Sequence, residues 1–174
     1  MHTFNIGFRL ALALSLAALS WPTLAARVEA QAGRSYMGSD ATNALFVEGV
    51  FDPRHLGDSH WSWSPDALLG WIHGREIARF RAGRYTTQQD AWLLAAGARF
   101  HYGDVNHWYR HLFLSFQPAY NSARTQALSS PYEFVSTLGW QGRRFSVQLR
   151  HVSNARLHQP NRGETMALAG FAFP

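Results

Sequence analysis

The chain has 174 residues, a length that suits one domain and is short for two. It contains no cysteine, so no disulfide can stabilise a small core. Its formal net charge of +5 rests on arginine alone, because the sequence contains no lysine. The arginines are scattered rather than clustered, which disfavours a nucleic-acid-binding protein. Single arginines of this kind favour contacts with solvent or with anionic lipid phosphates.

The N-terminus has the layout of a secretory signal. Arg9 precedes an uncharged apolar run from Leu10 to Leu19, and small residues follow it. We expect cleavage after Ala25, with Ala30 as the second choice. An uncleaved membrane anchor is the alternative, although the run is at the short end of the ~20 apolar residues that a spanning helix needs. Cleavage divides the chain into a signal peptide, residues 1–25, and a mature domain, residues 26–174.

The mature part contains recurring segments in which apolar and polar residues alternate, and polar breaks marked by Gly or Pro separate them. This period of two indicates β-strands. The region 54–64 is rich in Gly, His, Ser and Asp and is expected to be a loop. No segment after the signal is long and apolar enough to span a membrane as a helix. The expected strands are, in chain order, residues 27–33, 43–51, 67–73, 91–102, 108–120, 132–140, 144–154 and 165–173.

Eight strands are the smallest number that closes a barrel with side chains filling its interior. Tryptophans are spread along the mature chain, as in barrels whose aromatic residues lie at the two membrane surfaces. The predicted fold class is therefore all-β: an eight-stranded antiparallel transmembrane β-barrel of the bacterial outer membrane.

The strand at 144–154, with the sequence RFSVQLRHVSN, carries the candidate chemistry. Side chains alternate between the two faces of a strand, so its apolar face continues into His151 and Ser153. The apolar face of a membrane barrel points at lipid. If this is the seventh strand of a barrel with periplasmic termini, its C-terminal end lies at the outer leaflet. Both side chains would then face a lipid substrate.

These residue types suit ester hydrolysis. Ser153 is a candidate nucleophile, and His151, two residues earlier on the same face, is a candidate base. The base needs an acid to orient it, and Glu164 is the nearest acid in sequence. An oxyanion could be bound by Asn154, Asn161 and the loop amides around Arg156. Grooves beside Phe145, Val147 and Leu149 would hold an acyl chain, and Arg150 or Arg156 could meet phosphate. The plainer reading is a strand end whose polar residues meet headgroups.

The stretch from His151 to Glu164, HVSNARLHQPNRGE, resembles the signature of the lipid A deacylase family, the PagL-type 3-O-deacylases of the outer membrane. The shared pattern is a His-x-Ser-Asn, a leucine, a Gln-Pro-Asn, a glycine and an acidic residue. The resemblance implies that His151 is the base, Ser153 the nucleophile and Asn161 the oxyanion residue. It implies hydrolysis of the 3-hydroxyacyl ester at position 3 of lipid A in lipopolysaccharide, without metal or cofactor.

The chain departs from that pattern at two places. Gly163 and Glu164 are adjacent, whereas one residue usually separates the glycine from the acid, so an ungapped alignment puts Thr165 in the acid's place. Strand parity agrees: if Phe171 and Phe173 face lipid, Thr165 does too and Glu164 points inward. In addition, Arg156 stands at a position that is commonly glycine.

Other readings are open at this point. A non-catalytic structural or adhesive outer-membrane barrel is the main alternative, and an outer-membrane phospholipase or acyltransferase is a third. The partners expected are lipopolysaccharide and membrane lipid, with no nucleic acid, and a homodimer is left open. A metal site is disfavoured because none of the histidine groups has a recognised ligand spacing. The groups considered are His101, His107 and His111, and His55 and His60.

Overall fold

The computed structural model describes residues 27–81, 83–104 and 106–173, so the expected signal peptide lies outside the described residues. Eight long strands and one short strand, β3, account for most of this part of the chain. Two 3-10 helices, η1 (Ala78–Phe80) and η2 (Trp108–His111), lie in connections. The strands are β1 (Arg27–Met37), β2 (Asp40–Val50), β3 (Arg54–His55), β4 (Trp61–Ile72), β5 (Ala91–Tyr102), β6 (Leu112–Asn121), β7 (Tyr132–Gln141), β8 (Phe145–Ser153) and β9 (Glu164–Phe173).

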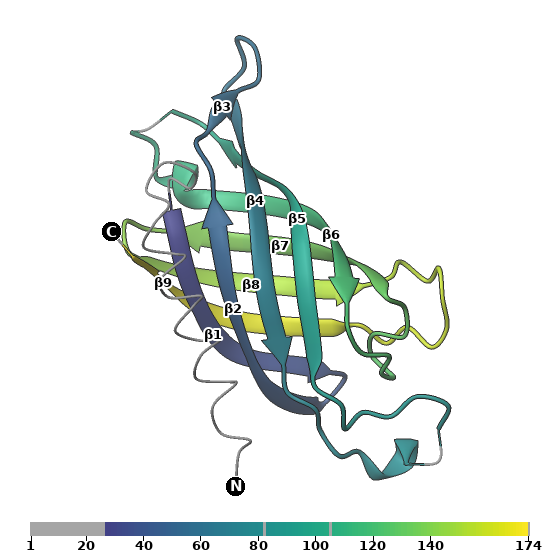
Figure 1. Cartoon of the computed structure of the whole chain (residues 1–174). Helices are drawn as coiled ribbons and strands as arrows, with labels where there is room; N and C mark the ends of the chain where they lie inside the picture. The colour runs from purple at the N-terminus through teal and green to yellow at the C-terminus, as the bar shows by residue number, and fades with distance from the viewer. Residues whose placement is uncertain (1–26, 82, 105, 174) are drawn as a thin grey trace, which may run out of the picture.

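The long strands form a closed antiparallel barrel (Figure 1). From β4 to β9 each strand pairs with the next, and β1 pairs with both β2 and β9. The ring closes where β2 pairs with β4, so neither strand leaves a free edge there. This confirms the predicted eight-stranded antiparallel barrel.

Four expected boundaries need correction, and the first is the start of β2, which is Asp40 rather than residue 43. β4 begins at Trp61 rather than Ala67, because Ser62, Ser64 and Asp66 point into a polar interior and pair with β5 instead of forming a loop. β1 continues beyond residue 33 to Met37. The segment Trp108–His111 is η2 rather than the start of a strand.

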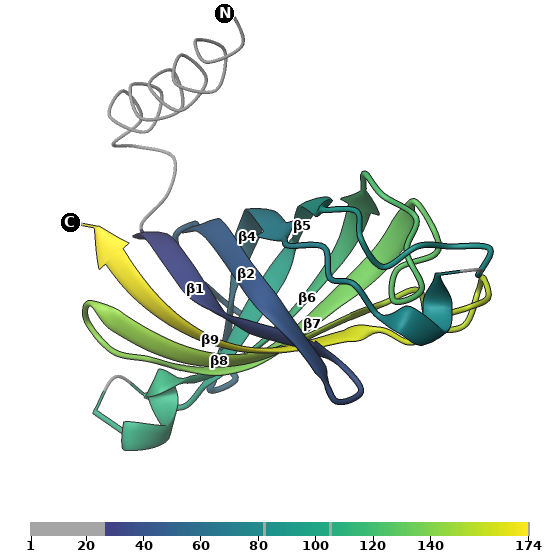
Figure 2. The ribbon, with the colours of Figure 1, turned by 90° about the horizontal axis from the view of Figure 1, so that it is seen from below.

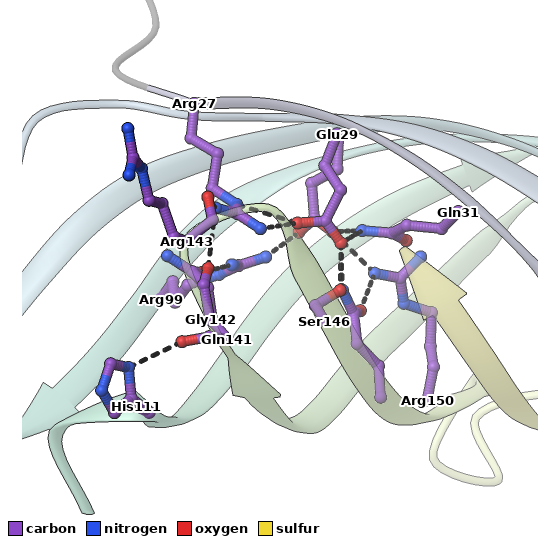
Figure 3. Close-up of polar contacts among 12 residues, drawn as sticks. Arg27, Glu29, Gln31, Arg99, His111, Gln141, Gly142, Arg143, Ser146 and Arg150 are labelled. Atoms are coloured by element: carbon purple, nitrogen blue, oxygen red, sulfur yellow. Dashed lines mark hydrogen bonds and ion pairs between the residues drawn. The ribbon is translucent and has the colours of Figure 1, made fainter. Parts of the chain in front are cut away.

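The barrel interior is polar and charged. Glu48 on β2 lies between Arg99 on β5 and Arg150 on β8, with N–O distances of 2.9 and 2.8 Å, and all three side chains are at most 1 % exposed. The guanidinium groups also stack over aromatic rings, Arg99 over Phe113 and Arg150 over Phe46. Figure 3 shows the neighbouring polar contacts that continue this network around Glu29 and Ser146.

The outer wall has the opposite character. Its exposed side chains are mostly aliphatic and aromatic, for example Leu94, Phe116 and Val147, each more than half exposed. A polar interior inside an apolar outer wall is the arrangement of a transmembrane barrel. Among the described residues, no helix has the length and apolarity that crossing a membrane as a helix requires.

The two ends of the barrel differ in their connections. The β4–β5, β6–β7 and β8–β9 connections gather at one end, as Figures 1 and 2 show. They also contact each other there: Gln126 donates to the carbonyl of Tyr85, and the guanidinium of Arg162 lies 4.7 Å from the Phe80 ring. The start of β1 and the end of β9 lie at the other end of the barrel. We call the first of these the loop end.

Candidate active site

β8 presents different residues to the inside and outside of the barrel. Ser146, Gln148 and Arg150 are buried in the interior, whereas His151 is exposed on the outer wall and Ser153 is partly exposed. The strand therefore turns both candidate side chains outward near the loop end. Arg150 cannot meet a substrate phosphate, contrary to expectation, because it is fully buried against Glu48.

His151 is oriented by a hydroxyl group. Its Nδ1 lies 2.9 Å from Oγ1 of Thr165, which stands directly opposite on β9. If Nδ1 carries the proton and donates it to this hydroxyl, Nε2 is left as the basic nitrogen. Both His151 and Ser153 are described, and no hydrogen bond joins them in this structure. Such catalytic contacts often tighten only when substrate binds.

Glu164 faces the interior and does not orient His151, which corrects the sequence prediction. Its carboxylate accepts a hydrogen bond of 2.6 Å from the Ser35 hydroxyl and forms an ion pair with Arg75. In the β8–β9 register it stands opposite the buried Val152, whereas Thr165 stands opposite His151. The regular alternation of β9 therefore places the threonine, and not the acid, beside the imidazole.

The chain turns sharply after Ser153. Ala155 and Arg156 both have positive φ, 52° and 67°, and the N–H of Leu157 donates to the carbonyl of Asn154 at 3.0 Å. The left-handed region costs non-glycine residues roughly 1–2 kcal/mol each, so surrounding contacts must hold this turn. The N–H groups of Ala155 and Arg156 have no acceptor among the described residues. They are therefore available as donors in the turn that directly follows Ser153 along the chain.

The two candidate oxyanion asparagines have different roles. Asn154 is fully buried, and its side-chain amide donates to the carbonyl of His158 at 3.1 Å, so this side chain holds the loop instead of facing substrate. Asn161 is only partly buried, and its Oδ1 accepts the backbone N–H of Asn154 at 3.3 Å. That contact leaves the Nδ2 donors of Asn161 without a partner in the described part of the chain, beside Ser153.

The β8–β9 loop is fixed against its neighbours. His158 contacts the Ser129 hydroxyl through Nδ1 at 3.0 Å, and the N–H of Gly163 donates to the carbonyl of Ala127 at 3.0 Å. Gly163 has a φ of 70°, and an added Cβ would lie 2.8 Å from Cε1 of His151. Only glycine satisfies both the backbone conformation and this close approach to the imidazole.

The comparisons with known proteins agree with this geometry. The family model of the lipid A 3-O-deacylases (PagL) matches residues 51–174, which is more than half of the chain. The chain belongs to this family. The crystal structure of the outer membrane enzyme PagL matches with a TM-score of 0.54 and 20 % identity, covering 86 % of this chain and 99 % of that one. This confirms the resemblance, and at that identity the structural match supports the fold.

A weaker structural match is the Yersinia pestis outer membrane protein Ail in a phospholipid bilayer nanodisc. Its TM-score is 0.43 at 12 % identity, with 84 % of this chain and 99 % of that one covered, and no argument rests on it. No curated protein sequence matches the chain significantly. The lipid A 3-O-deacylase family and the shared barrel fold place the protein in the bacterial outer membrane, with lipid A as the substrate of an ester hydrolase.

A groove beside His151 gives this deacylase-family barrel room for an acyl chain. It measures about 500 Å³ and opens on the outer wall across β5 to β9. A second groove of about 360 Å³ shares three of its lining residues and continues toward the other end of the barrel. Leu149 lines the first groove as expected, whereas Phe145 and Val147 line neither. The shared residues are Phe100, Leu114 and Leu138.

The sequence alone did not single out Ser136, which the structure places on the outer wall. It stands directly opposite His151 on β7 and lines the first groove. A deacylase-family barrel thus presents two serines to one histidine, one across the strand pair and one along the strand. Ser136 belongs to no recognisable motif, so only the pairing of β7 with β8 shows that it lies beside His151.

At the loop end, the pKa shift of Asp90 is caused by its immediate neighbours. Asp90, at the end of the β4–β5 connection, has a lowered pKa because the backbone N–H of Gly74 donates to its carboxylate, with further donation from Trp71 and His73. These contacts close the base of the connection, away from His151. Within the described residues, no cluster of three His, Asp or Glu side chains could hold a metal ion.

Proposed function

We propose that this barrel removes the 3-hydroxyacyl chain from position 3 of lipid A, with Ser153 as the nucleophile and His151 as the base. The observation that supports this is an imidazole and a serine hydroxyl on the lipid-facing wall, beside an apolar groove. Membership of the lipid A 3-O-deacylase family gives the substrate. Because these groups face outward, an acyl ester can reach them without leaving the bilayer.

The proposed reaction gives each of these groups one role. Ser153 Oγ attacks the ester carbonyl carbon while Nε2 of His151 takes its proton. The oxyanion of the tetrahedral intermediate accepts hydrogen bonds from Nδ2 of Asn161 and from the N–H groups of the Ala155–Arg156 turn. The imidazolium then protonates the sugar oxygen as the C–O bond breaks, which leaves an acyl-serine. Water, activated by the same histidine, releases the hydroxy acid and restores Ser153.

Thr165 takes the orienting place that an acid would occupy. Its hydroxyl accepts the Nδ1–H of His151 and fixes the tautomer, although it carries no charge to stabilise the imidazolium. We therefore infer a Ser-His pair oriented by a threonine, and a turnover slower than that of an enzyme with a carboxylate at this position.

The active site would face the outer leaflet. Bacterial outer-membrane barrels keep both termini in the periplasm. The start of β1 and the end of β9 lie at the end opposite to His151, so the loop end is extracellular in this orientation. Lipopolysaccharide occupies that leaflet, and its acyl chains would run along the groove from His151 toward the membrane interior.

Mass spectrometry of lipid A after incubation with the purified, detergent-folded barrel tests the proposal. We expect the loss of one hydroxyacyl chain with the wild type and none with Ser153→Ala. Ser39→Ala, in the exposed β1–β2 turn, serves as the matched serine control and should keep the activity. Ser136→Ala decides between the two serines: abolition by this change alone would make Ser136 the nucleophile.

The inward position of Glu164 favours one competing function, a non-catalytic relative that serves as a structural or adhesive surface barrel. An unchanged lipid A profile with correctly folded wild type would support it. Hydrolysis of phospholipid supplied alone would instead indicate a phospholipase.

A further inference from the structure

Arg34 on β1 is an isolated charge on the outer wall. It is exposed and lies on the same face of β1 as Ala32 and Tyr36. In the described parts of the eight long strands, no other arginine, aspartate or glutamate points outward; the rest face the interior. A charged side chain on the lipid face of a barrel is unfavourable unless it reaches the headgroups, so its position needs a partner.

The pairing of the strands brings Arg34 to the active site. β1 pairs with β9, and β9 pairs with β8, so Arg34 stands opposite Ala167, which stands opposite Leu149, two residues before His151 on β8. At the usual strand spacing and rise per residue, Arg34 and His151 are therefore about 12 Å apart. Both residues lie close to the loop end, Arg34 three residues before the end of β1 and His151 two residues before the end of β8. The intervening outward positions of β9 are the small residues Thr165 and Ala167. A sugar ring can therefore lie flat on the wall between the guanidinium and the imidazole.

The guanidinium is held in place and still has free donors. Nη1 of Arg34 donates to Oδ1 of Asn43, which points outward from the paired position on β2. Arginine has five N–H donors in a planar fork, a geometry that matches phosphate oxygens bidentately. The remaining donors of Arg34 have no acceptor among the described residues.

We propose that Arg34, positioned by Asn43, binds the phosphate on the glucosamine that carries the scissile ester. The inference rests on the proposed lipid A hydrolysis and adds a substrate-binding residue to it. The acyl groove extends from His151 toward β5, on the side away from β1. The substrate therefore lies across His151, with its acyl chain on one side and its phosphate on the other, and Arg34 selects a phosphorylated glycolipid.

The test compares two substrates and three variants in detergent micelles. The substrates are lipid A with its phosphate at position 1 and the same lipid A without it. The variants are Arg34→Gln, Arg34→Lys and the control Arg144→Gln, an exposed arginine in the connection between β7 and β8 at the opposite end of the barrel. The rate of hydroxy acid release, measured at several substrate concentrations, gives kcat/KM for each variant. The migration of unheated samples on gels, compared with that of heated samples, shows whether each variant is folded.

We expect Arg34→Gln to lower kcat/KM about tenfold or more on the phosphorylated substrate, mainly through KM, and to leave the dephosphorylated substrate unaffected. Arg34→Lys should keep part of the preference, and Arg144→Gln all of it. An equal loss on both substrates, or no loss on either, would overturn the assignment. Failure of the proposed function would look different, because the wild type would then release no hydroxy acid from either substrate.

A further experiment distinguishes the phosphate of the substrate from inorganic phosphate and from the phosphate of other lipid headgroups. Inorganic phosphate or excess phosphatidic acid, added to wild type with dephosphorylated lipid A, should not change the rate, since we assign Arg34 to the phosphate of the substrate itself. Inhibition of the wild type by phosphatidic acid, combined with equal hydrolysis of both lipid A forms, would show a general lipid-headgroup contact and contradict the proposal.

Discussion

On β8 and β9, the charged side chains that face the barrel interior are buried in ion pairs, whereas the polar side chains that face outward are exposed or partly exposed. Inside, Arg150 and Glu164 each have a charged partner and are almost completely buried. Outside, His151 is exposed, and a threonine hydroxyl is the partner of its Nδ1. Two adjacent residues of β9 thus serve different purposes, since Glu164 pairs inside the barrel with Ser35 and Arg75 and Thr165 belongs to the outer site.

We therefore expect the inner groups to determine the stability of the barrel and the outer groups to determine its catalytic activity. A buried charge that loses its partner is strongly destabilising, so inner substitutions should affect folding. The outer groups are few and retain free donors and acceptors, so changes there should affect activity and spare the fold. The predictions below test that separation, beginning with the largest effect.

Removal of the base should have the largest effect. His151→Ala is expected to lower kcat by roughly 10⁴-fold, because Ser153 then has no group to take its proton. Urea unfolding of the barrel in lipid vesicles should be unchanged, since the side chain is exposed. A variant that keeps more than a tenth of the activity would rule out His151 as the base.

Loss of the central inner carboxylate should have the next largest effect, and on stability. Glu48→Ala leaves Arg99 and Arg150 buried without their shared partner, and we expect a destabilisation of about 3–5 kcal/mol. Urea titration monitored by tryptophan fluorescence measures it, with Glu48→Gln as the matched control that keeps the volume. If Glu48→Ala is as stable as the wild type, the inner network does not stabilise the barrel.

An acid placed on the outer face should raise activity. Thr165→Glu puts a carboxylate beside Nδ1 of His151, and we expect kcat to rise about tenfold, because the charge stabilises the imidazolium. Thr165→Val, which removes the acceptor, should lower kcat several-fold. Steady-state release of the hydroxy acid measures both. A decrease with glutamate would argue against Thr165 as the orienting residue.

The inner acid should have the smallest effect on catalysis. Glu164→Gln keeps hydrogen-bonding capacity toward Ser35 and Arg75, so kcat should stay within about threefold of the wild type. The same assay decides the point. A hundredfold loss in a folded variant would return Glu164 to the orienting role that the sequence pattern suggested.

Local periodicity was sufficient to predict the barrel and the outward direction of His151, because alternation along one strand needs no knowledge of its partners. It failed at the start of β4, where Ser62 and Ser64 resemble a loop although they face a polar interior. It also indicated, through strand parity, that Glu164 points inward, while the motif pointed to Glu164 as the acid.

The sequence alone could not predict that Ser136 and Arg34 lie near His151. Each position depends on the register between two paired strands, β7 with β8 across a short connection and β1 with β9 far apart along the chain. Alternation along a single strand gives the face on which each residue lies, but it does not give the residue that stands opposite on the neighbouring strand. Likewise, the sequence does not show that the backbone N–H groups of Ala155 and Arg156 are free to donate, because this depends on the positive φ angles of the turn.

Covalent labelling by a fluorophosphonate lipid analogue tests the central claim most directly, because this reagent reacts with a serine only when a base activates it. Peptide mass mapping should find the phosphonyl adduct on Ser153 in the wild type and no adduct in His151→Ala. An adduct on Ser136, or an unlabelled Ser153 in a folded barrel that hydrolyses lipid A, would contradict the account.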